Sequence, residues 1–209
     1  MPKPTKEILK HLEKDPILKK CISLIDLQGD DEYIDIFVYL VKSIVSQQLS
    51  IKSAASIYNR LIHHDDIDPI DPTSFLRVPD DELRALGLSY QKARYVKNVC
   101  QFFIDNEISM DKWKSMTDQE IIDLLIQIKG VGIWTVQMVL MFALHRPDVL
   151  PEGDLGIQLG MKKLYNIKQE KKELFKTMRK IAEKWSPSRT IACMYIWRYK
   201  DTSAVSNGK

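Results

Sequence analysis

The chain has 209 residues and a formal net charge of +3, from 31 Lys and Arg against 28 Asp and Glu. This length allows a buried core in one domain or in two small ones. The start, MPKPTKEILKHLEKDP, has no apolar signal segment, and the longest apolar run, around residues 136–144, is too short to span a bilayer. We therefore expect no membrane association and a location in the cytoplasm or nucleoid, or in the nucleus of a eukaryote.

Cysteine and histidine spacing suggests neither a disulfide framework nor a zinc or iron–sulfur site. The three cysteines lie far apart, and the four histidines show no metal-ligand spacing. We expect buried free thiols at Cys21, Cys100 and Cys193 and no metal site built from side chains. Residues 161–185 are strongly basic, a pattern that is compatible with nucleic acid but is equally typical of a solvated helix.

Helical periodicity dominates the first half of the chain. Residues 36–45 and 50–62 carry apolar residues at three- and four-residue spacing, which predicts two amphipathic helices. The DPIDPT segment at residues 68–73 then breaks the chain. A helix that begins at Pro79-Asp80 is expected to end at Gly87, and Ser89 can cap the next helix, YQKARYVKNVCQFF.

Helices also account for the second half. Thr117–Glu120 has the pattern of a capping box ahead of an apolar helix that we expect to end at Gly130. A further helix follows and runs to about residue 144, and two or three more, split at Ser186-Pro187, complete the chain before a disordered tail at 201–209. Strand-like alternation is nearly absent, so the sequence predicts an all-α fold of roughly nine or ten helices.

A short turn, Gly130-Val131-Gly132, joins two apolar segments in IKGVGIWTVQMVL. Glycine admits positive φ and the close approach of another molecule, and the start of the following helix presents N–H groups that favour an anion. This is a helix-hairpin-helix arrangement, which holds a DNA phosphate independently of base sequence. We expect Val131 to point inward and Lys129 to add a cation beside the phosphate. An ordinary tight turn between helices is the alternative.

Five segments resemble, in order, the landmarks of the helix-hairpin-helix DNA glycosylases. They are FVYLVKSIVSQQLSIKSAASIYNRL, LRALGLSYQKARYVKNV, IKGVGIWTVQMVLMFAL, DVLPEGDLGIQLGMKKLY and KWSPSRTIACMYIWRY. Within that superfamily the chain is most similar to the alkylbase (3-methyladenine) DNA glycosylases of the AlkA and yeast Mag type. The resemblance implies two helical subdomains with an active-site cleft between them, without the N-terminal β-rich domain of AlkA. The hairpin would lie in an inserted subdomain at about 46–145, and the second subdomain would comprise about 1–45 and 146–200.

Asp154 matches the catalytic aspartate of this family, and its Asp-x-x-Ile pattern with Ile157 supports that register over Glu152. As an N-glycosidic bond breaks, positive charge builds on the sugar, and an ionised carboxylate below the ring stabilises it. The same carboxylate can orient the attacking water. For an aspartate in such a loop, a helix cap is the alternative role.

Two tryptophans and a methionine are implied to form the base pocket. Trp134 occupies the position where relatives that also cut the backbone carry a lysine nucleophile, so the resemblance implies a monofunctional enzyme. Its indole offers an electron-rich face to cationic bases such as 3-methyladenine and 7-methylguanine. Trp197 matches a second pocket tryptophan, with core packing as its alternative. Met138 stands where AlkA has a tyrosine, a departure that leaves the substrate range open.

The segment SIVSQQLSIKSAA resembles the stretch whose tip enters the minor groove and fills the gap left by a flipped nucleotide. Gln48 or Leu49 is the expected plug. Gln47 and Ser50 can equally hydrogen-bond the backbone where two helices meet.

Three basic residues are less specific. Lys92 and Arg94 either contact phosphates or form exposed helix surface, and Arg189 is expected to make a structural ion pair. The resemblance thus implies a monomeric enzyme that flips alkylated purines out of damaged double-stranded DNA and hydrolyses their N-glycosidic bond. It needs no cofactor, and the family suggests only a monovalent cation, Na⁺ or K⁺, at the hairpin carbonyls. Alternatives are a glycosylase for uracil, hypoxanthine or oxidised purines, a non-catalytic DNA-binding module, and a helical protein–protein adaptor.

Overall fold

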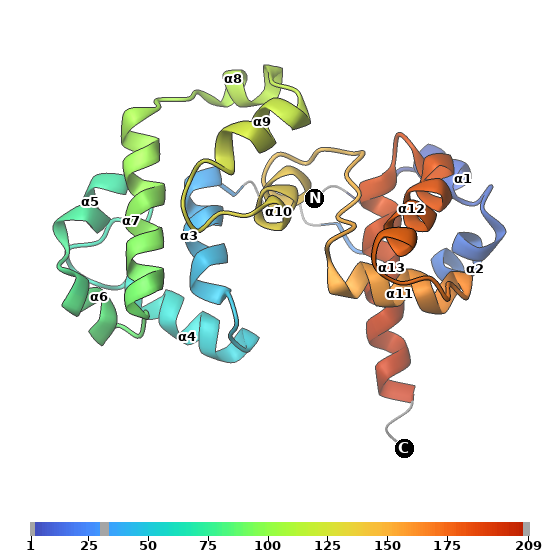
Figure 1. Cartoon of the computed structure of the whole chain (residues 1–209), viewed down its shortest axis with the longest axis horizontal. Coiled ribbons are helices and arrows are strands. Elements are labelled where there is room, and N and C mark those ends of the chain that lie inside the picture. The colour runs from blue at the N-terminus through green and yellow to red at the C-terminus, as the bar shows by residue number, and fades with distance from the viewer. Residues whose placement is uncertain (1–2, 30–33, 207–209) are drawn as a thin grey trace. The chain divides into compact units, whose positions relative to one another are not determined.

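The computed structural model describes residues 3–29 and 34–206, with side chains through residue 200. This part of the chain contains only helices and no β-strand (Figure 1), which confirms the expected all-α fold. The elements are α1 (Lys6–Leu12), α2 (Pro16–Leu24), α3 (Ile36–Ser46), α4 (Ile51–Ile62), α5 (Pro72–Arg77), α6 (Asp80–Ala85), α7 (Tyr90–Asp105), α8 (Met110–Ser115), α9 (Asp118–Leu125), α10 (Ile133–Phe142), α11 (Leu155–Tyr165), α12 (Lys171–Ala182), the 3₁₀-helix η1 (Glu183–Trp185) and α13 (Arg189–Ser206). None of these helices combines the length and apolar character of a membrane span.

Short helices raise the number above the nine or ten expected. Pro16 and Pro72 occupy the first positions of α2 and α5, with Asp15 and Asp71 as N-caps. A proline at the first helical position loses no hydrogen bond, and its fixed φ suits a helix. The DPIDPT segment therefore begins a helix as well as breaking the chain.

Residues Tyr33–Leu144 form one compact unit. Within it, α7 lies beside α3, α5 and α6, and α3 also packs on α4 and α10 (Figure 1). Leu40, Ile44 and Phe75 are almost completely buried in its core. The unit begins near residue 33 rather than at the expected 46, because α3 packs on three helices of this unit.

Residues Met1–Glu32 and His145–Lys209 form the second unit, in which α13 contacts α11 and α2. Asp15, only 3% exposed, accepts hydrogen bonds from Trp185 Nε1 at 3.1 Å and from the Tyr165 hydroxyl at 2.8 Å. Burial raises the pKa of Asp15, but these bonds and two main-chain N–H groups outweigh it and hold the pKa below its usual value. The network ties the N-terminal segment to the C-terminal helices.

The ends of several helices test the expectations directly. The capping box at Thr117–Glu120 and the Ser89 cap of α7 are confirmed, and Gly87, with a φ of +112°, directly follows the C-cap of α6 as expected for a helix end. In contrast, α9 ends at Leu125 and not at Gly130, because two tight turns, Ile128 N–H to Leu125 and Val131 N–H to Ile128, replace the last helical turn.

The C-terminal tail also differs from expectation. Helix α13 continues through Ser206, six residues into the segment predicted to be disordered. Between Pro187 and Gly208 no proline or glycine interrupts the sequence, so nothing local stops the helix. Residues 207–209 of the predicted tail lie outside the described residues.

Candidate functional site

Asp154 is the N-cap of α11. Its Oδ1 accepts a hydrogen bond from the main-chain N–H of Ile157 at 2.8 Å, so the Asp-x-x-Ile spacing is that of a helix cap. The capping role considered from the sequence is therefore present. A carboxylate has two oxygens and about four lone-pair sites, so capping does not exclude a catalytic role.

Trp197, on α13, orients the same carboxylate. Its Nε1 donates a hydrogen bond to Oδ1 of Asp154 at 2.7 Å. Gly156 makes room for this contact, because a Cβ there would lie 2.9 Å from Cδ1 of the indole and 3.0 Å from Oδ1 of Asp154. The pocket role of Trp197 stays a prediction, while its contact gives it a positioning role. Gly156 was missed, although a glycine in the first turn of a helix is itself an unfavourable and therefore informative choice.

Glu152, the alternative acid, is engaged elsewhere. Its carboxylate forms an ion pair with Arg179, accepting from Nε at 2.6 Å and also from Nη2. This pairing uses the Glu152 charge to fix the loop to α12. Of the two acids, Asp154 is the one that a ring N–H orients.

A second ion pair fixes the start of the same loop. Arg189 donates from Nε and Nη2 to the two oxygens of Asp148, both at 2.7 Å, which confirms the structural pairing expected for Arg189. Burial raises the pKa of Asp148, but the hydrogen bonds from Arg189 and Ser186 outweigh it and leave the pKa below its usual value. The loop before Asp154 is thus attached to α13.

The two hairpin glycines have different conformations. Gly130 has a φ of +108°, and an added Cβ would lie 2.4 Å from Cγ of Tyr95. Val131 is 6% exposed and points inward as expected. Gly132 does not need positive φ: its φ is −103°, and an added Cβ would meet no atom within 4 Å. The fold explains Gly130, whereas the approach of another molecule to Gly132 stays a prediction.

The start of α10 suits an anion. Gly132 is the N-cap, and no side chain makes a capping hydrogen bond there. The N–H groups of a first helical turn have no partner within the helix, and this end of the helix dipole attracts negative charge. Lys129 is exposed in the adjoining turn, and its carbonyl accepts a hydrogen bond from Asn98 Nδ2 at 3.1 Å.

Trp134 and Met138, one turn apart on α10, line the same pocket of about 260 Å³ together with Tyr39 and Lys42. The indole is 44% exposed and Met138 is 6% exposed. Burial raises the pKa of Tyr39 to about 12, so its phenol is protonated at neutral pH. The structure therefore brings together these two of the predicted pocket residues.

The connection between α3 and α4 carries the predicted plug. Gln48, with a φ of +57°, is exposed, and Leu49 is 39% exposed, so both candidates lie at an exposed tip. Ser50 is the N-cap of α4, and Gln47 Nε2 donates to the carbonyl of Gly130 at 3.3 Å. Gln47 and Ser50 therefore have the backbone-bonding role that was their alternative.

Lys92 holds the end of α3. Its Nζ donates to the carbonyls of Val45 at 2.7 Å and Gln47 at 2.6 Å, and burial lowers the pKa of this ammonium group. Lys92 thus has a structural role within the protein, which differs from the phosphate contact and the exposed helix surface considered for it. Ile51, next to the tip, is 92% exposed and was missed, because apolar spacing alone does not distinguish the buried from the exposed positions at the end of a helix.

The structure brings one histidine together with two acids, which the spacing did not show. His64, Asp66 and Glu82 each place a ligand atom within 4.8 Å of the others. However, His64 Nε2 lies 3.0 Å from Glu82 Oε1, and its Nδ1 accepts from the main-chain N–H of Asp66 at 3.2 Å. Both ring nitrogens therefore have partners within the protein. The three cysteines are buried free thiols, as expected.

Comparisons with known proteins show the family of the chain. The family model described as HhH-GPD superfamily base excision DNA repair protein matches residues 41–187. The DNA-3-methyladenine glycosylase 1 of Schizosaccharomyces pombe is 33% identical over 161 residues, which cover 76% of this chain and 70% of the relative. A Bacillus subtilis relative, provisionally named for the same activity, is 30% identical over 81% of this chain, which spans only 61% of that protein's length.

Solved structures share the fold over nearly the whole chain. A DNA-3-methyladenine glycosidase from Bacillus halodurans superposes with a TM-score of 0.80 at 32% identity, covering 98% of this chain and 94% of the other. The Schizosaccharomyces pombe 3-methyladenine DNA glycosylase Mag1, solved in complex with abasic DNA, has a TM-score of 0.80 at 28% identity and covers 92% and 96%. The helix-hairpin-helix fold is therefore common to all three.

Proposed function

Because the chain belongs to the HhH-GPD superfamily of base excision DNA repair proteins, we propose that it is a monofunctional DNA glycosylase. It binds double-stranded DNA, flips an alkylated purine of the 3-methyladenine or 7-methylguanine type out of the duplex, and hydrolyses its N-glycosidic bond. The names of its relatives support this substrate class. The structural observation that carries the proposal is the carboxylate of Asp154, held at a helix N-cap by Trp197.

In the proposed reaction, the bond between the sugar C1′ and the base nitrogen breaks, and its electrons leave with the base. A cationic alkylated purine thereby leaves as a neutral molecule. The Asp154 carboxylate stabilises the positive charge that develops on the sugar. The oxygen of a water then bonds to C1′, and the water loses a proton towards the carboxylate and solvent. The hydrogen bond from Trp197 keeps the carboxylate in one orientation throughout.

The pocket at Trp134 and Met138 supports the base specificity. A half-exposed indole offers its face to a cationic purine, and the methionine sulfur packs against the same base. Neither side chain has an amine, so no Schiff base with the sugar can form at this position and the strand stays intact. We therefore propose that the enzyme lacks lyase activity.

The hairpin supports DNA binding through phosphates. The start of α10, where Gly132 is open to approach, would hold one backbone phosphate. Because its substrate is DNA, the enzyme would act in the cytoplasm or nucleoid, or in the nucleus of a eukaryote. We also propose that Na⁺ or K⁺ binds the hairpin carbonyls. Those of Lys129 and Gly130 each accept one side-chain hydrogen bond and have a second lone pair, a ligand type that suits monovalent cations. DNA affinity should fall when a bulky organic cation replaces both ions at constant ionic strength.

A base-release assay tests the activity. Wild type and Asp154→Asn are incubated with duplexes that carry 3-methyladenine, 7-methylguanine, uracil, hypoxanthine or 8-oxoguanine. Asparagine is also a good N-cap, so the fold is kept while the charge is lost. We expect the variant to release alkylated purines at least about 100-fold more slowly. Glu152→Gln, which removes a neighbouring charge that pairs with Arg179, is the control and should retain the wild-type rate.

The outcomes separate the alternatives. Release of only neutral lesions would replace the alkylation proposal with one of the other base specificities. DNA binding without release of any base would indicate a non-catalytic module. Strand breaks that appear without heat or alkali would contradict the monofunctional assignment.

A further inference from the structure

A pocket of about 370 Å³ lies between α7 and the hairpin, and its lining includes none of the residues proposed to act on the base and sugar. Its lining consists of Gln91, Arg94, Tyr95, Asn98 and Lys129. The first four occur at the spacing of one helix face, and the fifth comes from the hairpin turn. All five belong to the unit Tyr33–Leu144.

The walls of this pocket are held by contacts within the protein. Asn98 Nδ2 donates to the carbonyl of Lys129 at 3.1 Å, and Gln91 Nε2 donates to the Tyr95 hydroxyl at 2.6 Å. The ring of Tyr95 packs on Gly130, where the hairpin turns with a φ of +108°. These contacts attach the pocket to the hairpin turn.

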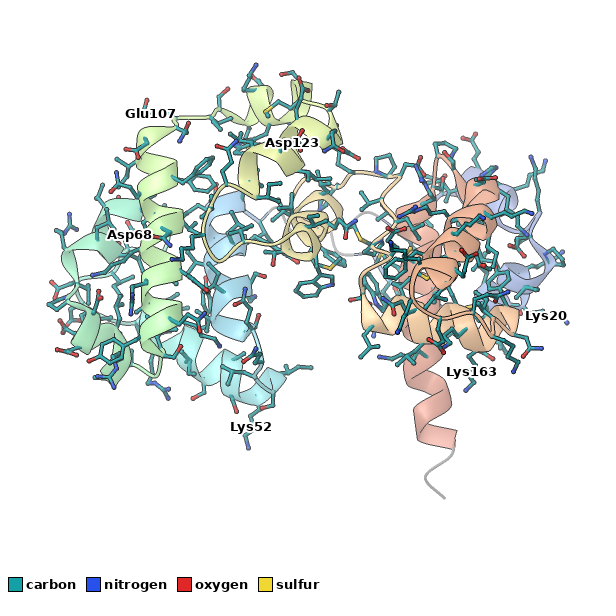
Figure 2. All side chains as sticks on the ribbon, viewed as in Figure 1. Lys20, Lys52, Asp68, Glu107, Asp123 and Lys163 are labelled. Atoms are coloured by element: carbon teal, nitrogen blue, oxygen red, sulfur yellow. The ribbon has the colours of Figure 1, made fainter. Side chains whose placement is uncertain are left out.

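Two positive charges meet in the pocket. Arg94 and Lys129 both line it, and no carboxylate does. Among the residues whose side chains are described, neither forms an ion pair, whereas Lys97 on the same helix is paired with Asp80 at 2.6 Å. Lys20, Lys52 and Lys163, labelled in Figure 2, extend from α2, α4 and α11, and none of them is among the residues that line this pocket.

The lining selects a phosphate in particular. A guanidinium group binds two phosphate oxygens at once, and an ammonium group adds a point charge. The amides of Gln91 and Asn98 and the phenol of Tyr95 add polar groups to the same lining.

We infer that this pocket binds a second phosphate of the DNA backbone, beside the phosphate held by the N–H groups at the start of α10. The inference rests on the proposed function and extends it. Lys129 adjoins both positions, since it lines the pocket and directly precedes Gly130. A strand held at the hairpin would thus be held again by Arg94, which fixes its direction over the protein as well as its position.

The test measures the affinity for an undamaged duplex as a function of salt concentration. Each phosphate contact contributes about 0.9 to the slope of log K against log salt. Arg94→Gln should therefore lower the slope by about 0.9 and weaken binding several-fold. Arg94→Lys, which keeps the charge, should retain most of the slope. Arg77→Gln is the matched control, because it removes the same charge outside this pocket. The Arg77 side chain is 67% exposed and its Nη2 lies 4.0 Å from Asp71 Oδ2, so this variant should bind DNA as wild type does.

The outcomes separate a DNA phosphate in this pocket from the alternatives. An Arg94→Gln slope equal to that of wild type overturns the inference and leaves the glycosylase proposal intact. Calorimetric titration with inorganic phosphate forms a second arm: Arg94-dependent phosphate binding, combined with an unchanged DNA slope, assigns the pocket to a free phosphate and also overturns it. Because no base release is measured, a wild type that binds DNA without catalysis contradicts only the proposed activity. A wild type that does not bind DNA contradicts both.

Discussion

The two hairpin glycines allow a paired test of what each position does. Gly130→Ala places a methyl group at a φ of +108°, 2.4 Å from Cγ of Tyr95. A left-handed conformation costs an L-residue about 1–2 kcal/mol, and the ring of Tyr95 must also move. Gly132→Ala places the same methyl group where no atom lies within 4 Å, at an ordinary φ of −103°. The two changes are chemically identical and structurally opposite.

We expect opposite results from the two variants. Gly130→Ala should lower the free energy of unfolding by about 2 kcal/mol or more. Gly132→Ala should change it by less than about 1 kcal/mol, since alanine reduces the freedom of the unfolded chain but is a poorer N-cap than glycine. For DNA binding by the folded protein the order should reverse, with Gly132→Ala losing more affinity than Gly130→Ala. A methyl group that keeps a phosphate from the main-chain N–H groups removes about 1.5–3 kcal/mol, or about 10- to 100-fold in affinity.

Urea unfolding and fluorescence anisotropy with an undamaged duplex measure the two quantities. Affinities are compared at a temperature where both variants are folded, so that loss of structure does not contribute. If Gly132→Ala binds DNA as tightly as wild type, the hairpin is not where a phosphate approaches. If it destabilises the protein more than Gly130→Ala does, the conformational reasoning itself is wrong.

Three further predictions concern hydrogen bonds. Trp197→Phe removes the N–H that orients Asp154 and should lower kcat by about 10- to 100-fold with little change in KM. As a control, Trp185→Phe removes the same kind of hydrogen bond from Asp15 and should lower the stability of the protein but not kcat. Lys92→Met removes the donor at the end of α3, so hydrogen exchange measured by mass spectrometry should become faster in the α3–α4 connection and remain unchanged in α13. The pKa of Asp15 is lower in the folded chain than the usual 3.8. The stabilisation from its carboxylate is therefore complete above about pH 4 and is lost as the pH falls through the folded pKa. Between pH 5 and 3, the free energy of unfolding measured with urea should depend less on pH in Asp15→Asn than in wild type.

Each of these has a result that contradicts it. A purely pocket-lining Trp197 would change KM and leave kcat alone. Unchanged exchange in Lys92→Met would mean that the tip is held by other contacts. An equal pH dependence with and without the Asp15 carboxylate would assign acid destabilisation to other groups.

Much of the local structure could be predicted because its signals lie within a few residues of one another. A serine three positions before the N–H it caps, as at Ser89, or the reciprocal pair in the capping box of α9, is visible in the sequence itself. The same holds for the hairpin, where the glycine spacing predicted the turn. Asp154, in contrast, was assigned through the resemblance to the family, with Ile157 three residues on as local support.

Contacts between distant segments could only come from the tertiary structure. Trp197 lies 43 residues from the carboxylate it orients, and Lys92 lies 47 residues from the first carbonyl it holds. No local pattern encodes such pairs, because they depend on which helix faces pack together. Packing also decided that the helix starting at Ile36 belongs with the hairpin unit, and that Gly130 needs its conformation for the protein itself whereas Gly132 does not. Sequence alone thus predicted the residues for the chemistry, and packing determined how each is held, since an orientation depends on neighbours that are far away along the chain.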